Sequence, residues 1–187
     1  MVIRMKYRGK MGAGHFISSL SSRYIKWTAY GIVILLTSIL QSLPNFLPPI
    51  GGARPALMVP VVVCIAMFEG PVGGAAAGVA GGILWDLFSD RLLGFNALLL
   101  LIICCACGLM SQLLIRNNLI SSMLMTAAAL FIQGLISWFF YDFMFENQQA
   151  LTALLSLSIP GFFYSLFLTP PIYFVVYSVA KILRNRE

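Results

Sequence analysis

Long apolar stretches, separated by short segments that hold most of the prolines and charges, dominate this chain. A helix needs roughly 20 apolar residues to cross the hydrocarbon core of a bilayer. The stretches are close to that length, so the pattern predicts an all-α integral membrane protein. The six predicted transmembrane helices span residues 27–43, 55–70, 72–88, 97–115, 119–141 and 160–180.

The second predicted span is unusually short. Its apolar part, Pro55–Phe68, would reach only about 21 Å as a helix, against a core of about 30 Å. Glu69, Gly70 and Pro71 follow it and predict a turn. We therefore expect this helix to be surrounded by protein, to be extended, or to lie in thinned bilayer.

The positions of the charged residues predict the orientation. Residues 1–26 form a basic tail, and residues 27–187 form a single transmembrane domain. With the N-terminus inside, the inner segments carry ten Lys and Arg residues, whereas the outer loops carry only Arg54 and Arg91. Because basic residues accumulate in cytoplasmic loops, both termini are predicted to be cytoplasmic.

Composition agrees with a membrane class. The chain is 60% hydrophobic and 10% charged. Soluble domains are less apolar and carry many more charges. The net charge of +6 does not indicate nucleic acid, because the basic residues are those that membrane topology requires and they can meet anionic lipid headgroups. Membrane lipid is the predicted surrounding, and no nucleic-acid partner is expected.

Four glycines form the strongest local pattern. Gly70, Gly74, Gly78 and Gly82 recur at steps of four and would form a ridge of small residues along the third span. Helices in lipid associate through close packing, so this ridge predicts a docking surface for another helix. Packing inside the bundle is favoured over a partner, but both are open. A phosphate-binding loop is excluded, because no Lys-Ser or Lys-Thr follows the glycines.

Asp86 lies one further step of four beyond Gly82, near the outer end of the same span. A carboxylate at this depth is costly unless it is paired, hydrated or protonated, so it is a candidate functional residue. The alternative is that it caps the loop or reaches the headgroups beside Asp90 and Arg91. The sequence leaves the two interpretations equally weighted.

Catalytic and metal-binding patterns are not found in the sequence. The one histidine, His15, lies in the basic tail, and Asp86 has no obvious carboxylate companion. Cys104, Cys105 and Cys107 cluster in an apolar span, but no His, Asp or Glu nearby in sequence completes a metal site. We predict no catalytic residue, no metal and no cofactor.

The segment from Gly78 to Leu98 resembles the central signature of the bacterial rod shape-determining MreD family. In that family a glycine-rich helix ends in an Asp, and a short outer loop leads to Leu-Gly and then Ala-Leu. The corresponding residues here are Gly78, Gly82, Asp86, Leu93, Gly94, Ala97 and Leu98. Asp86 and Asn96 are the polar residues that we single out in this segment.

The resemblance implies a non-enzymatic scaffold of the peptidoglycan elongation machinery that maintains rod cell shape. It implies binding to MreC and extends the candidate partners to MreB and the side-wall peptidoglycan synthases. The location would be the bacterial cytoplasmic membrane. The glycines would form a helix-packing or partner surface, for which our candidates are Gly70, Gly74, Gly78, Gly82 and Gly94.

The alternative function is transport. Substrate-binding subunits of energy-coupling vitamin transporters are similar in length, six-helix topology and small-residue helices. Such a subunit would need a polar, aromatic-lined pocket toward the outer side. Trp85, Asn96 and Trp138 are the residues that could contribute to it.

Overall fold

A computed structural model describes residues 13–43, 55–89, 92–113, 118–140 and 159–184. Every regular element in these ranges is helical, and five helices are long and apolar enough to cross a membrane. The helices are α1 (Ala13–Ser42), α2 (Met58–Leu87), α3 (Phe95–Leu113), α4 (Leu119–Trp138) and α6 (Ile159–Arg184).

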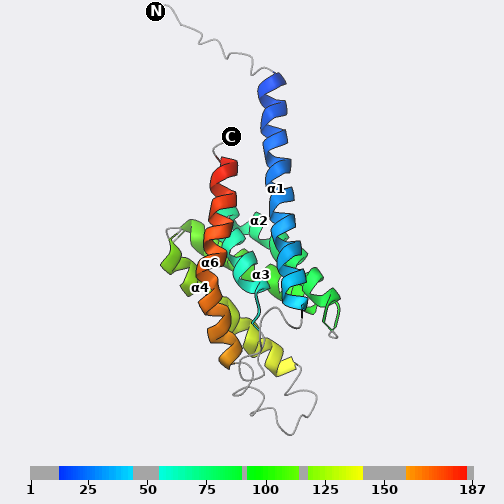
Figure 1. Ribbon diagram of the computed structural model, residues 1–187, viewed down its shortest axis with the longest axis vertical. Coiled ribbons are helices and arrows are strands. Elements are labelled where there is room, and N and C mark those ends of the chain that lie inside the picture. Colours follow the sequence, from blue (N-terminus) through cyan, green and yellow to red (C-terminus); the bar gives the residue numbers. More distant parts are fainter. Residues whose placement is uncertain (1–12, 44–54, 90–91, 114–117, 141–158, 185–187) are drawn as a thin grey trace, which may run out of the picture.

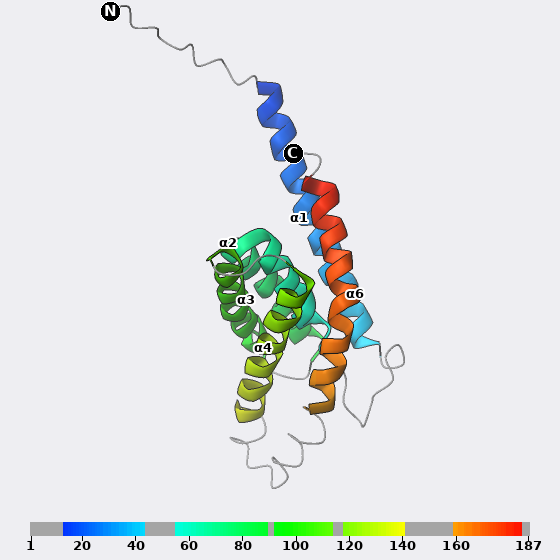
Figure 2. The same ribbon diagram turned by 90° about the vertical axis from the view of Figure 1, so that its left-hand side faces the viewer.

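The helices form one bundle with α2 at its centre (Figures 1 and 2). Figure 2 shows α1 and α6 along one edge of the bundle and α3 along the opposite edge, with α4 between α3 and α6. The first part of α1 extends beyond the bundle, and the N-terminal end of α1 lies at the same end of the molecule as the C-terminal end of α6.

Where the sequence predicts two spans, 55–70 and 72–88, the structure has one element that reverses direction. Gly70 breaks α2 with a φ of 79°, and its backbone conformation is one that essentially only glycine adopts without strain. Beyond it the chain folds back, because a methyl group added to Gly74 would lie 2.5 Å from the Ala66 Cβ atom. Gly81 likewise lies against Met58 and Val62. The two segments of α2, residues 58–69 and 71–87, are therefore antiparallel.

This reversal defines two ends of the bundle. The Gly70 end contains the turn of α2, and the Asp86 end contains the start and the finish of α2. α1 runs antiparallel to the first segment of α2, since the Gln41 Oε1 atom accepts from the Met58 amide at 3.0 Å while Lys26 contacts Glu69. α6 runs parallel to that segment, with Ser165 near Ala56 and Tyr173 packed on Phe68.

Residues Met58–Met67 are buried on every face of their helix. A helix that is apolar all round is stable only inside protein or lipid, and α1, α3, α4 and α6 surround this one. Of the three arrangements expected for the short second span, the structure selects the first, because neighbouring helices and not lipid cover it.

Other boundaries differ modestly from those predicted. α1 begins at Ala13, so residues 13–26 of the predicted tail continue the first helix. The predicted spans 97–115, 119–141 and 160–180 correspond to α3, α4 and α6, with ends shifted by a few residues. The predicted outer-loop residues Arg54 and Arg91 lie outside the described residues.

Candidate functional site

Asp86 is a buried carboxylate at the end of α2. It occupies the same face as Gly74, Gly78 and Gly82, because it follows them at the same step of four, and it is only 1% exposed. The interpretation in which Asp86 reaches the headgroups is therefore wrong, whereas the interpretation in which it caps the loop agrees with its hydrogen bonds. Its side chain points toward the start of α3 and not toward the membrane surface.

Both Asp86 oxygens accept hydrogen bonds from the chain around the start of α3. The Oδ2 atom accepts from the Gly94 amide at 2.8 Å and, more weakly, from the Ala97 amide at 3.4 Å. The Oδ1 atom accepts from the Asn96 side-chain amide at 2.7 Å. Amide groups in the first turn of a helix have no partner within it, and the helix dipole favours a negative charge there. Asp86 thus caps α3 from a neighbouring helix.

Gly94 allows the chain to approach the carboxylate. Its φ of 92° lies in the left-handed region, where a side chain would be strained. This conformation precedes α3 directly and accompanies the short contact between the Gly94 amide and Asp86. The backbone conformation thus explains why a glycine follows the leucine in the Leu-Gly pair of the sequence pattern.

The polar cluster continues into a third helix. The Gln133 Nε2 atom on α4 donates to the Asn96 Oδ1 atom at 3.3 Å, so a chain of side chains links α4, α3 and α2. Gln133 is 5% exposed, and its Oε1 atom has no hydrogen-bond partner among the described residues. We name Asp86, Asn96 and Gln133 the polar triad.

The glycine face of α2 packs on the backbone of α3. A methyl group at Gly74 would lie 2.9 Å from the Cys104 carbonyl oxygen, and one at Gly78 would lie 2.6 Å from the Leu100 carbonyl oxygen. One at Gly82 would overlap the Ala97 backbone. Successive glycines thus meet residues progressively earlier in α3, which makes α3 antiparallel to the second segment of α2.

The sequence pattern missed a second polar cluster, at the Gly70 end. Glu69, which the sequence assigns only to the predicted turn after the second span, has a side chain that is only 13% exposed. Its Oε1 atom lies 2.8 Å from the Lys26 Nζ atom and accepts from the Tyr30 hydroxyl at 2.8 Å. Only the position of Glu69 beside an apolar span signalled it, since its partners lie on another helix.

The part of the chain that the structure describes contains no group of three or more His, Cys, Asp or Glu side chains able to hold a metal. Both Asp86 oxygens already accept hydrogen bonds from residues around the start of α3, so the contacts of this carboxylate are those of a structural residue. Trp85, one of the three residues considered for a ligand pocket, lines a cavity at the Asp86 end, whereas Asn96 and Trp138 do not.

These features define a class: a multi-pass helical membrane protein whose glycine-rich helix and buried carboxylate hold its core together. Residues 21–184, most of the chain, match the family model of the rod shape-determining protein MreD. The chain belongs to the MreD family, as the resemblance in its central segment indicated, and thus to a structural membrane family that acts in rod shape determination. No curated protein and no solved structure matches it, so the comparisons give the transporter alternative no support.

Proposed function

We propose that this chain is a non-enzymatic scaffold of the peptidoglycan elongation machinery in the bacterial cytoplasmic membrane. The observation that carries the proposal is the family match over residues 21–184. The geometry supports it, because Gly74, Gly78, Gly82 and Asp86 all make contacts within the bundle. These residues serve to fix the positions of α2 and α3, so the outer faces of the helices remain for partners.

The scaffold crosses the membrane six times in this proposal, with both termini in the cytoplasm. The reversal at Gly70 supports it, because the two segments of α2 run in opposite directions between the Asp86 end and the Gly70 end. The excess of Lys and Arg in segments next to the Gly70 end supports the cytoplasmic assignment of that end. A single crossing by α2 would instead put the two termini on opposite sides.

Reporter fusions test this topology at one discriminating position. Alkaline phosphatase fused after Ser89 is expected to be active, and green fluorescent protein fused at the same point is expected not to fluoresce. The reason is that six crossings put this point outside the cytoplasm. Fusion at the C-terminus is expected to give the reverse. Fluorescence after Ser89, combined with phosphatase activity at the C-terminus, would show that α2 crosses only once.

The proposed direct partner is MreC, and through it or beside it MreB and the side-wall synthases. With the glycine face covered by α3, a partner helix must contact another surface. Each outer helix presents large apolar side chains outward, including Ile32 on α1, Leu98 on α3, Phe131 on α4 and Phe167 on α6. These faces contact lipid where no partner covers them.

Site-specific cross-linking tests the partner. A photo-reactive phenylalanine analogue placed singly at Ile32, Leu98, Phe131 or Phe167 is expected to capture MreC in cells from one face of the bundle and not from all four. Unirradiated cells and a strain without MreC are the controls. If no position captures MreC in cells whose rod shape the labelled chain restores, direct binding to MreC is wrong.

A further inference from the structure

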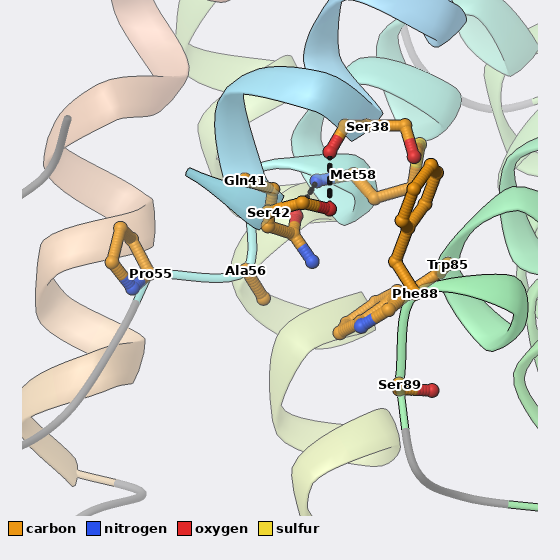
Figure 3. A pocket seen from close by; sticks show the side chains of 9 residues that line it. All are labelled: Ser38, Gln41, Ser42, Pro55, Ala56, Met58, Trp85, Phe88 and Ser89. Carbon is orange, nitrogen blue, oxygen red and sulfur yellow. Dashed lines mark hydrogen bonds between the residues drawn. The ribbon is translucent and has the colours of Figure 1, made fainter. Parts of the chain in front are cut away.

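A cavity of about 250 Å³ lies at the Asp86 end, between the end of α1 and the two ends of α2 (Figure 3). Its wall includes Gln41 from α1, Pro55 before α2, and Trp85, Phe88 and Ser89 from the end of α2. The polar triad does not line it, so the cavity is separate from the Asp86 cluster. Ligand pockets usually measure about 300–1,000 Å³, so this one fits a small molecule or one unit of a chain.

The wall offers hydrogen-bond donors to an occupant. The Gln41 Oε1 atom accepts from the Met58 amide at 3.0 Å, which fixes the side chain, and among the described residues nothing accepts from its amide nitrogen. Among the described residues, no acceptor pairs with the Trp85 indole N–H. Figure 3 shows both side chains extending into the space between α1 and the end of α2. An occupant must therefore supply acceptor oxygens.

The described part of the wall favours one kind of occupant over two others. Among the described residues, no Lys, Arg, Asp or Glu lines the cavity, so these residues favour an uncharged ligand over a charged one. An acyl chain would leave the Gln41 and Trp85 donors unpaired, at a cost for each buried donor. The occupant that fits is small, neutral and rich in oxygen.

Two aromatic side chains narrow the chemistry further. Trp85 and Phe88 form one side of the cavity, and aromatic faces carry a negative potential that attracts weakly positive C–H groups. A sugar ring presents such C–H groups on its flat face and oxygens around its edge. We propose that this cavity binds one uncharged sugar residue, stacked on Trp85 and Phe88 with an oxygen accepting from Gln41. The proposal rests on the cavity alone and does not depend on the scaffold role.

Saturation-transfer NMR on the full chain, using N-acetylglucosamine as the probe, tests the proposal. The protein is held in an amine-oxide detergent, because a detergent with a sugar headgroup would compete. Transfer to the sugar is expected with the wild type, and an added alkyl glucoside should suppress it. Sorbitol, a neutral polyol without a ring, should give no transfer.

Gln41→Glu is the sharpest variant, because the carboxylate still accepts from the Met58 amide but no longer donates into the cavity. It and Trp85→Ala are expected to weaken sugar binding about tenfold or more. Trp138→Phe, outside the cavity, should leave binding unchanged. A folded wild type that shows no transfer overturns the proposal, as does equal transfer to sorbitol or equal transfer in Gln41→Glu. Stronger transfer to a neutral tripeptide would assign the cavity to a peptide instead.

Discussion

Replacing Asp86 by alanine is expected to destabilise the folded chain by about 3 kcal/mol or more, since each buried donor left without a partner costs about 1–3 kcal/mol. The change leaves the Gly94 amide and the Asn96 side-chain amide without their acceptor. The start of α3 also loses the negative charge that its dipole favours. The measurement is thermal unfolding in mild detergent, together with the amount of chain in the membrane.

Asp86→Asn should be much milder, and the polar triad explains why. An asparagine at position 86 can still accept from the Gly94 amide, while its own amide group donates to Asn96 if the Asn96 side chain turns over. Once the Gln133 amide group also turns over, Asn96 donates to the Gln133 Oε1 atom, which has no partner in the wild type among the described residues. The three side chains can therefore reverse the direction of their hydrogen bonds together.

A double-mutant comparison checks this reversal. In a Gln133→Leu background the reversed chain has no final acceptor, so Asp86→Asn is expected to cost about 1 kcal/mol more than it does in the wild type. Equal costs in the two backgrounds would show that the triad does not couple. If Asp86→Ala unfolds at the wild-type temperature, the carboxylate does not hold α3 in place.

Replacing Gly82 by leucine is the second large change, expected to cost about 4 kcal/mol or more and to abolish accumulation of the folded chain. A side chain at Gly82 meets the Ala97 backbone, which cannot move aside as the end of a flexible side chain could. Gly78→Leu should act similarly, since the Leu100 carbonyl oxygen lies 2.6 Å from an added methyl group. The α2–α3 contact would have to separate in both variants.

Ala80→Leu is the matched control, because Ala80 lies on the same segment of α2 but faces outward. It adds the same apolar bulk and is expected to change stability by no more than about 0.5 kcal/mol. The comparison uses membrane accumulation and recovery of cell shape in a strain that lacks the wild-type chain. The close-packing explanation fails if Gly82→Leu and Ala80→Leu accumulate and restore shape equally.

The sequence predicted the class of protein because partition into a bilayer depends mainly on local composition. Stretches such as 97–115 and 119–141 are apolar enough to predict membrane helices without their neighbours, and the structure places α3 and α4 there. The central signature from Gly78 to Leu98 also identified the family, which the match over residues 21–184 confirms.

The sequence by itself determined the spacing of the glycines and the position of Asp86 on the same helical face, since a step of four is a property of one helix. Only the tertiary structure decided what lies opposite that face. Asp86 meets Asn96, Asn96 meets Gln133, and Glu69 meets Lys26 and Tyr30, in pairs that neither helical period nor apolar pattern encodes. The physical reason is that the pattern of apolar residues predicts which segments leave water for the bilayer. The hydrogen-bond partner of a buried polar side chain depends instead on which helix the fold brings alongside it.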